Sequence, residues 1–283
     1  MAYKTILVHA NDERRFPELI TAAVEFARQH GSHLIGLAAM PQIAFTGYEV
    51  GLAAPIIFEE ERKAFHKAEA CLKAQFEQAT SGAMLAGFTA EWRCVESGFE
   101  PASDLVIRHA RAVDLLIISQ ADPDWPDSPR YDAPELLALE AGRPVLVVPN
   151  KGRKSLIAKR IVVAWNGRRE ATGAVFDALP LLKAAEEVRV LWVNPQEEHG
   201  EAGDLPAAEI CATLARHGVK CEETQPVSPQ ATVGETLLFE TTRFGFELLV
   251  MGCYGHSRFR EFVLGGASRH VLQNMTVPVL MSH

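Results

Sequence analysis

The chain has 283 residues, of which 48% are hydrophobic and 23% charged, and its formal net charge is −8. A chain of this length exceeds what one hydrophobic core usually serves, so two domains are expected. The acid-leaning balance excludes a nucleic-acid-binding groove, which needs a basic patch. No apolar run reaches the length of about 18 residues that spans a membrane, and the opening residues lack a signal-peptide pattern. The composition therefore predicts a soluble, cytoplasmic protein without nucleic-acid or membrane partners.

The cysteines exclude two further classes of protein. The chain has five of them, and no two form a C-x-x-C pair: Cys71, Cys94, Cys211, Cys221 and Cys253. This spacing indicates neither a zinc site nor a disulfide framework, so we expect reduced thiols and no structural metal.

The two halves of the chain repeat one pattern. Three strand-like segments of the first half match three of the second in the same order, namely 4–12 with 159–167, 114–119 with 247–252, and 143–148 with 277–281. A helix-period segment follows the first strand of each half, at Phe16–His30 and at 170–185. The offset between matching segments falls from 155 residues to 133, so the first half holds about 22 extra residues. We expect them within 41–80, where a helix-like run covers 59–78.

Short β-branched runs that alternate with helical segments are typical of βαβ units in a parallel sheet. The repeat therefore predicts an α/β fold of two tandem Rossmann-like domains, each a five-stranded parallel sheet with helices on both faces. We place these domains at residues 1–150 and 155–283, joined by the polar segment 151–155. In such sheets a ligand binds beyond the carboxyl ends of the strands, where the strand order reverses. In the second half, the segments 164–167, 191–194 and 251–255 should therefore meet at one crevice.

The most informative motif lies in residues 252–268. An apolar run at 246–251 predicts a buried strand that ends at Gly252, and 262–274 predicts a helix that begins at Gly265 and Gly266. Glycine loops and helix N-termini present backbone N–H groups to an anion, so the arrangement predicts a phosphate cradle in which a Cβ at Gly252 would collide with the phosphates. The alternative, that these glycines only form a turn, stays open.

The G-x2-G-x9-G spacing of this motif resembles the nucleotide-binding signature of the ATP-binding branch of the universal stress protein (UspA-like) family. The tandem arrangement resembles that of its two-domain members over nearly the whole chain. The resemblance implies an adenine nucleotide α-hydrolase-like fold whose domains pair through their last strands around a pseudo-twofold axis. It also implies that the second domain binds ATP, AMP or ADP. The site residues are expected to be Ala164, Trp165, Asn166, Val193, Met251, Gly252, Gly255, His256, Arg258, Gly265, Gly266, Ala267 and Ser268.

The resemblance also indicates which part of a nucleotide each group would contact. Val193 and the segment 164–166 should surround adenine and ribose, and the glycine segment should surround ribose and phosphates. Family members usually carry Ser or Thr where this chain has Gly266, and Asp where it has Asn166. An amide cannot supply a carboxylate ligand to a metal, so binding of Mg²⁺ together with the nucleotide is only weakly supported. Trp165 is expected either to stack on the purine or to pack in the core, and both alternatives stay open. His256 is expected either to contact a phosphate or to be solvated, and both alternatives stay open.

The first half lacks the cradle. The segment 119–141 contains no glycine, and its prolines and aspartates would oppose a polyphosphate. Residues 1–150 hold 13 Lys and Arg against 21 Asp and Glu, whereas residues 151–283 hold 15 of each. Only the second half is therefore expected to accept an anion. We expect Asp12 to be a solvated helix-capping residue and His9 a hydrogen-bonded structural histidine.

Three hypotheses of function follow. The first is a stress-response binding protein that holds an adenine nucleotide in its second half. The second is a slow ATPase, although the chain has no Walker loop and no carboxylate pair for two metals, so no catalytic residue is named. The third is a scaffold whose first half binds another small molecule, with apolar residues of the 41–80 insertion forming a cover or an interface. Whether the chain forms a homodimer stays open.

Overall fold

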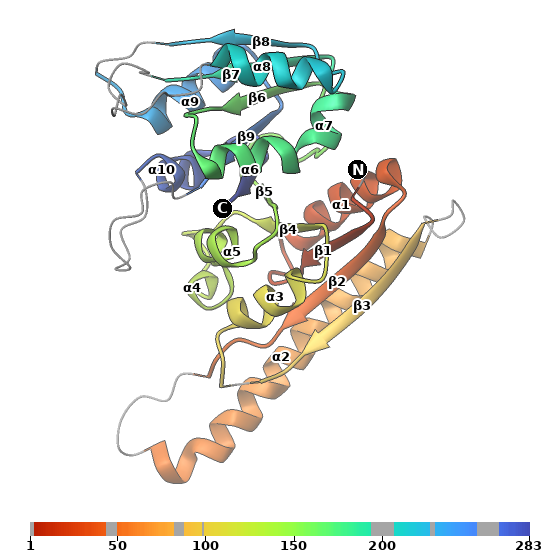
Figure 1. Cartoon of the computed structure of the whole chain (residues 1–283). Helices are drawn as coiled ribbons and strands as arrows, with labels where there is room; N and C mark the ends of the chain where they lie inside the picture. The colour runs from red at the N-terminus through yellow and green to blue at the C-terminus, as the bar shows by residue number, and fades with distance from the viewer. Residues whose placement is uncertain are drawn as a thin grey trace.

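The computed structural model describes residues 3–43, 50–81, 88–97, 99–193, 207–226, 230–253 and 266–283, with the backbone alone for 50–53. Its strands form a single ten-stranded sheet in the order β3-β2-β1-β4-β5-β10-β9-β6-β7-β8 (Figure 1). The strands are β1 (Thr5–His9), β2 (His33–Ala39), β3 (Thr89–Val95), β4 (Leu115–Ser119), β5 (Val145–Val148), β6 (Arg160–Ala164), β7 (Glu187–Leu191), β8 (Cys221–Thr224), β9 (Leu248–Gly252) and β10 (Val279–Ser282).

The described helices cover both faces of this sheet (Figure 1). They are α1 (Phe16–His30), α2 (Val50–Ser81), α3 (Ala102–Ala110), α4 (Ser128–Tyr131), α5 (Pro134–Glu140), α6 (Arg169–Asp177), α7 (Leu179–Ala184), α8 (Ala207–Arg216), α9 (Val233–Arg243) and α10 (Gly266–Asn274). No helix of the described residues is long and apolar enough to cross a membrane.

The sheet consists of two five-stranded halves with the same order. Every pair within β1–β5 and within β6–β10 is parallel, and the halves join where β5 and β10 pair antiparallel, with Leu146 opposite Leu280. This confirms the predicted fold of two tandem Rossmann-like sheets that pair through their last strands. No strand or helix lies between Val148 and Arg160, and we propose the domain boundary there.

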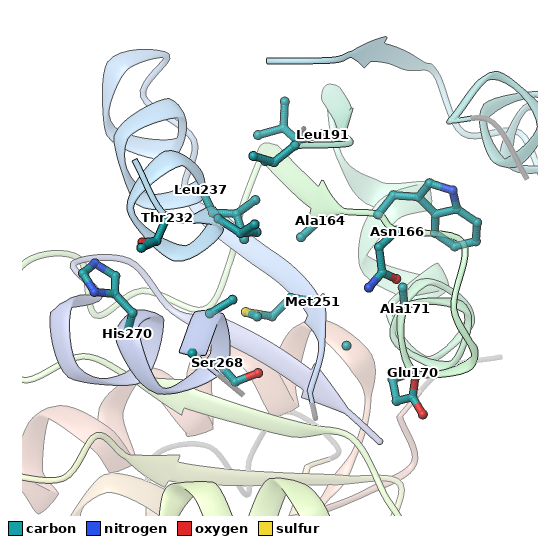
Figure 2. Close-up of a pocket in the computed structure, with 16 residues that line it drawn as sticks. Ala164, Asn166, Glu170, Ala171, Leu191, Thr232, Leu237, Met251, Ser268 and His270 are labelled. Carbon is teal, nitrogen blue, oxygen red and sulfur yellow. The ribbon is translucent and has the colours of Figure 1, made fainter. Parts of the chain in front are cut away.

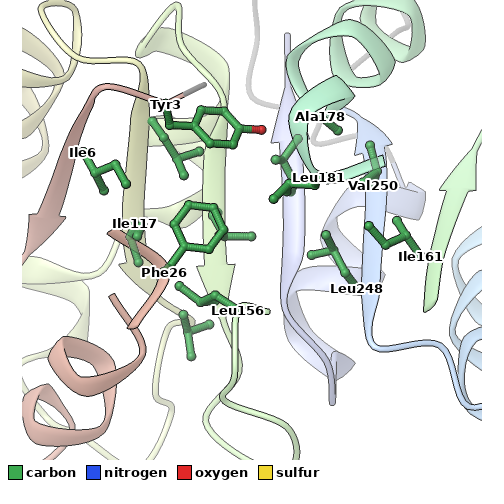
Figure 3. Close-up of a cluster of buried hydrophobic side chains, with 14 of the residues drawn as sticks. Tyr3, Ile6, Phe26, Ile117, Leu156, Ile161, Ala178, Leu181, Leu248 and Val250 are labelled. Carbon is green, nitrogen blue, oxygen red and sulfur yellow. The ribbon is translucent and has the colours of Figure 1, made fainter. Parts of the chain in front are cut away.

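Two hydrophobic clusters lie on opposite faces of the sheet and both run through the two halves. The central strands read as continuous apolar runs because they are buried on both faces. In one cluster Tyr3, Phe26 and Leu156 lie across from Leu181 and Val250 of the other half (Figure 3). The Tyr3 hydroxyl also donates a hydrogen bond of 2.6 Å to the carbonyl of Asp177. The halves therefore share their core in addition to their strand pairing.

The predicted helix at 16–30 is confirmed as α1, which ends at Gly31 in the left-handed conformation. The single helix predicted at 170–185 is wrong, because the chain forms two, α6 and α7, separated at Ala178. Pro180 is the cause, since it has no N–H to donate to the carbonyl four residues earlier and suits the first turn of a new helix.

The insertion of the first half forms most of α2, which begins earlier than the predicted run at 59–78 and extends beyond the sheet (Figure 1). Among its apolar residues, Ile43 is buried, Ile57 and Phe58 pack against the same small cluster, and Ile56 is exposed. The side chains of Phe45 and Leu52 lie outside the described residues.

Candidate functional site

A pocket of about 370 Å³ lies beyond the carboxyl ends of β6, β7 and β9 (Figure 2). The strand order reverses here, since β7 lies on one side of β6 and β9 on the other. This is the position at which doubly wound sheets bind ligands, and the volume lies within the usual range for small-molecule sites, about 300–1,000 Å³. The predicted crevice of the second half is thus a real cavity.

Nine of the residues expected to bind a nucleotide line this pocket. They come from four separate parts of the chain and are Ala164, Trp165, Asn166, Val193, Met251, Gly252, Gly266, Ala267 and Ser268. The other four predicted residues, Gly255, His256, Arg258 and Gly265, lie outside the described residues, as does the segment 262–265 of the predicted helix.

Three helices begin at the pocket wall. Glu170 and Ala171 line it from the first turn of α6, Thr232 and Val233 from the start of α9, and the segment 266–268 from the start of α10. Each helix N-terminus carries unpaired N–H groups and about half a positive charge. Such ends favour an anion, most clearly at α10, since the first turns of α6 and α9 also carry the carboxylates of Glu170 and Glu235.

Hydrogen bonds fix two of these helix starts. The Asn166 side-chain oxygen accepts a hydrogen bond of 3.1 Å from the backbone N–H of Arg168, which holds the turn that leads into α6. At α9, Thr232 and Glu235 form a capping box, in which Glu235 N–H donates to the Thr232 hydroxyl and Thr232 N–H donates to the Glu235 carboxylate at 2.8 Å. The hydrogen bonds from Thr232 hold the pKa of Glu235 below its usual value. Hydrogen bonds within the chain therefore hold Asn166 and Thr232 in place at the pocket.

Polar side chains lie on two opposite sides of the pocket. Asn166 and Glu170 lie along one side, Thr232 and His270 lie on the opposite side, and the Met251 side chain lies between them (Figure 2). Trp165, although it lines the pocket, is buried in the hydrophobic cluster that includes Trp192. Its surroundings favour packing over purine stacking.

Gly252 has a structural role in addition to the expected one. A Cβ there would lie 2.4 Å from the backbone nitrogen of Ala171 and 2.4 Å from the carbonyl carbon of Glu170. Glycine is therefore required so that β9 and the first turn of α6 can approach each other closely. This requirement is present before any phosphate is bound.

Sequence reasoning missed six residues that line the pocket: Glu170, Ala171, Thr232, Val233, Leu237 and His270. Leu191, which also lines it, belongs to the segment 191–194 that was expected there. A signal existed for one of the six, because Thr232-x-x-Glu235 before an apolar run is the pattern of a capping box. The remainder reach the pocket through strand order and helix packing, which no short pattern encodes.

The first half holds an ion-pair network at the carboxyl ends of its strands. Arg15 lies 2.7 Å from the Asp12 carboxylate and 2.9 Å from that of Asp132, and it also donates to the Gln120 carbonyl and the Asn150 side chain. Burial disfavours the charged form of Asp12, but hydrogen bonds from Arg14 and Arg15 hold its pKa below the usual value.

The pKa of Asp132 shifts in the opposite direction to that of Asp12. Burial raises this pKa, although Arg15 and the Ser128 hydroxyl both act to lower it. Asp12 is thus a buried member of an ion-pair network, and the expectation that it is solvated is wrong. Its carboxylate does accept a hydrogen bond of 2.9 Å from the backbone N–H of Arg14, in the turn that leads into α1. The guanidinium of Arg15 is thus the cation that pairs with both carboxylates at this end of the first half.

His9, at the end of β1, is buried, and its Nε2 has no hydrogen-bond partner among the described residues. Burial, and to a lesser extent Arg15, lowers its pKa from 6.5 to about 4. Between these values the unfolded chain binds a proton that the folded chain does not. We therefore expect stability to fall as the pH drops from 6.5 to 4, by about 3 kcal/mol from this group.

The measurement is urea unfolding at several pH values for the wild type and for His9→Leu. The difference in unfolding free energy between the two should shift by this amount across the window. Parallel pH profiles would show that His9 is protonated equally in both states.

The fold and the pocket define a doubly wound α/β protein with a cavity beyond the strand ends of its second half. Residues 158–283 match the model of the universal stress protein family. The second half of the chain is therefore a universal stress protein domain. No match was found among curated proteins.

Solved structures extend the similarity of fold to the whole chain. A universal stress protein from Archaeoglobus fulgidus DSM 4304 is 14% identical, with a TM-score of 0.69, and the match covers 98% of this chain and 95% of that one. A functionally unknown protein from Pseudomonas aeruginosa PAO1 is 15% identical, with a TM-score of 0.58, over 99% and 92% of the two chains. The fold of the whole chain is thus shared with proteins of nearly the same length.

Proposed function

We propose that this protein is a cytoplasmic universal stress protein that binds ATP or a related adenine nucleotide in the pocket of its second half, in a regulatory role. The observation that carries the proposal is the meeting of three helix N-termini at one cavity where the strand order reverses. A polyphosphate with an apolar base suits a cavity that combines helix N-termini with apolar side chains such as Leu191, Val193 and Leu237. All five cysteines are free thiols, in keeping with a reducing compartment.

The lining residues divide between the parts of such a ligand. Ala164, Leu191, Val193 and Leu237 offer an apolar surface that suits adenine, and the amide of Asn166 can hydrogen-bond the base or the ribose. The start of α10, with the Ser268 side chain, would receive phosphate oxygens.

Glu170 contributes a carboxylate to the pocket lining, and among the described residues no three His, Cys, Asp or Glu side chains lie together as metal ligands. We therefore propose that the nucleotide binds chiefly through protein N–H groups, with Mg²⁺ in a minor part.

Isothermal titration calorimetry of the full chain with ATP tests the proposal. We expect one site per chain with a dissociation constant near micromolar, which corresponds to about −8 kcal/mol. A matched variant, Ala164→Phe, places a phenyl ring in the pocket and should abolish the heat of binding while the circular dichroism spectrum stays native. Two equivalent sites per chain, or binding that survives Ala164→Phe, would contradict a single site in the second half.

Gly266→Ser should tighten ATP binding. Gly266 is the first residue of α10, and an added Cβ would meet no described atom within 4 Å. A hydroxyl there can donate to a phosphate, and a hydrogen bond to a charged group contributes at most about 1.5–3 kcal/mol, so an improvement of roughly tenfold is the expected scale.

Gly266→Ala is the control for Gly266→Ser, because it adds the Cβ without the hydroxyl and should leave the affinity nearly unchanged. Weaker binding by both variants would mean that the ligand needs the backbone of Gly266 at closer range than a Cβ allows.

A further inference from the structure

Strand β3 is one edge of the ten-stranded sheet. Among the described residues it pairs with β2 alone, over all seven of its positions from Thr89 to Val95. Its outer side therefore presents unpaired backbone N–H and C=O groups along a strand of ordinary length, and such an edge is able to pair with another strand. In Figure 1 this edge runs along the outside of the molecule, with α2 on one face of the strand.

The two faces of β3 differ. On one face, Trp92 packs toward α2 and its indole N–H donates a hydrogen bond of 2.6 Å to the carboxylate of Glu69. On the other face lie Glu91 and Arg93, two residues apart, with side chains 41% and 37% exposed. They form an ion pair with each other along the strand. The edge thus carries one negative and one positive charge, placed symmetrically about Trp92.

This arrangement is self-complementary in one antiparallel register. If two copies of β3 pair about a twofold axis through Trp92, Glu91 of each copy lies directly opposite Arg93 of the other. A shift of the axis to residue 91 or 93 would instead place two glutamates or two arginines opposite each other. Opposite charges stabilise directly paired positions and like charges destabilise them, so the charges select the first register.

The other edge of the sheet lacks this property. Strand β8 has four residues, and its central two are Glu222 and Glu223. Antiparallel pairing of two β8 strands about their centre would place these like charges opposite each other, which disfavours the contact.

We propose that β3 is an interaction surface for a second copy of this chain, joined through an antiparallel β3–β3 pair centred on Trp92. The twofold contact is isologous, so the same residues serve both copies and no further edge is created at the joint. The pairing extends the ten-stranded sheet across two chains. It is independent of the pocket and of the nucleotide proposal.

A charge exchange tests this contact. We expect the wild type to sediment at twice the 31.1 kDa of the single chain, in a concentration-dependent manner. Glu91→Arg alone and Arg93→Glu alone each place like charges opposite each other and should weaken the dimer by about tenfold or more. The double variant Glu91→Arg with Arg93→Glu restores opposite charges in the same register and should recover the wild-type dimer. Glu222→Arg, on the other edge, should leave it unchanged.

Disulfide trapping supplies a second measurement that depends on the register. In the proposed pair Ala90 lies opposite Cys94 of the other copy, so Ala90→Cys should give a dimer linked by disulfides under mild oxidation. The same substitution combined with Cys94→Ser should give none. A wild type that sediments as a single chain at all concentrations, or single charge variants that dimerise as well as the wild type, would overturn the proposal.

Discussion

Replacing Arg15 with methionine is expected to destabilise the protein by about 3–5 kcal/mol at pH 7, because it leaves two buried carboxylates without their shared cation. The side chains of Asp12 and Asp132 are 3% and 1% exposed, and Arg15 itself is 15% exposed. Arg15 also satisfies the Gln120 carbonyl and the Asn150 side chain, so its loss leaves further acceptors unpaired. Urea unfolding of Arg15→Met against the wild type measures the effect.

Arg14→Met is the matched control. Arg14 pairs with the same Asp12 carboxylate, at 2.9 Å, but its own side chain is 58% exposed. An exposed partner contributes little because water and salt screen it, so the loss should stay below about 1 kcal/mol. Equal losses for the two arginines would show that the network is solvated and that burial does not set its strength.

Gly252→Val is expected to lower the free energy of unfolding by about 3 kcal/mol and to abolish nucleotide binding together with it. The atoms that a Cβ would meet at 2.4 Å belong to the backbone of Glu170 and Ala171 and cannot rotate away. Either β9 or α6 must shift, and both line the pocket. Thermal or urea unfolding gives the stability, and calorimetry with ATP gives the binding.

Gly266→Ala is the control for Gly252→Val. It adds a Cβ to another glycine of the motif, but without a clash against backbone atoms. Both glycines lie at the pocket, but the space beside Gly266 is open in the described structure, so alanine there should change the unfolding free energy by less than 1 kcal/mol or so. Native stability of Gly252→Val would mean that α6 moves freely relative to β9. In that case the glycine would be required by the ligand alone.

The sequence by itself determined the repeat, the central strands and most of the pocket residues. Hydrophobic runs bounded by glycine are local signals, and the segments 114–119 and 247–252 carry them clearly. The ligand crevice followed from a topological rule, since parallel strands place their carboxyl ends at one edge of the sheet. Helix length was predicted less well, because a proline such as Pro180 decides whether one helix or two form.

The tertiary structure alone decided which distant groups meet. Arg15 and Asp132 are separated by 117 residues, and only the pairing of β1 with β4 brings their segments together to bury Asp12. The packing of α6 against β9 likewise decided that Gly252 serves a close backbone approach. The placement of α9 and α10 brought Thr232 and His270 to the pocket. Whether a residue is buried or paired with a charge depends on the strands and helices that pack beside it. The residues next to it in the chain do not specify those neighbours.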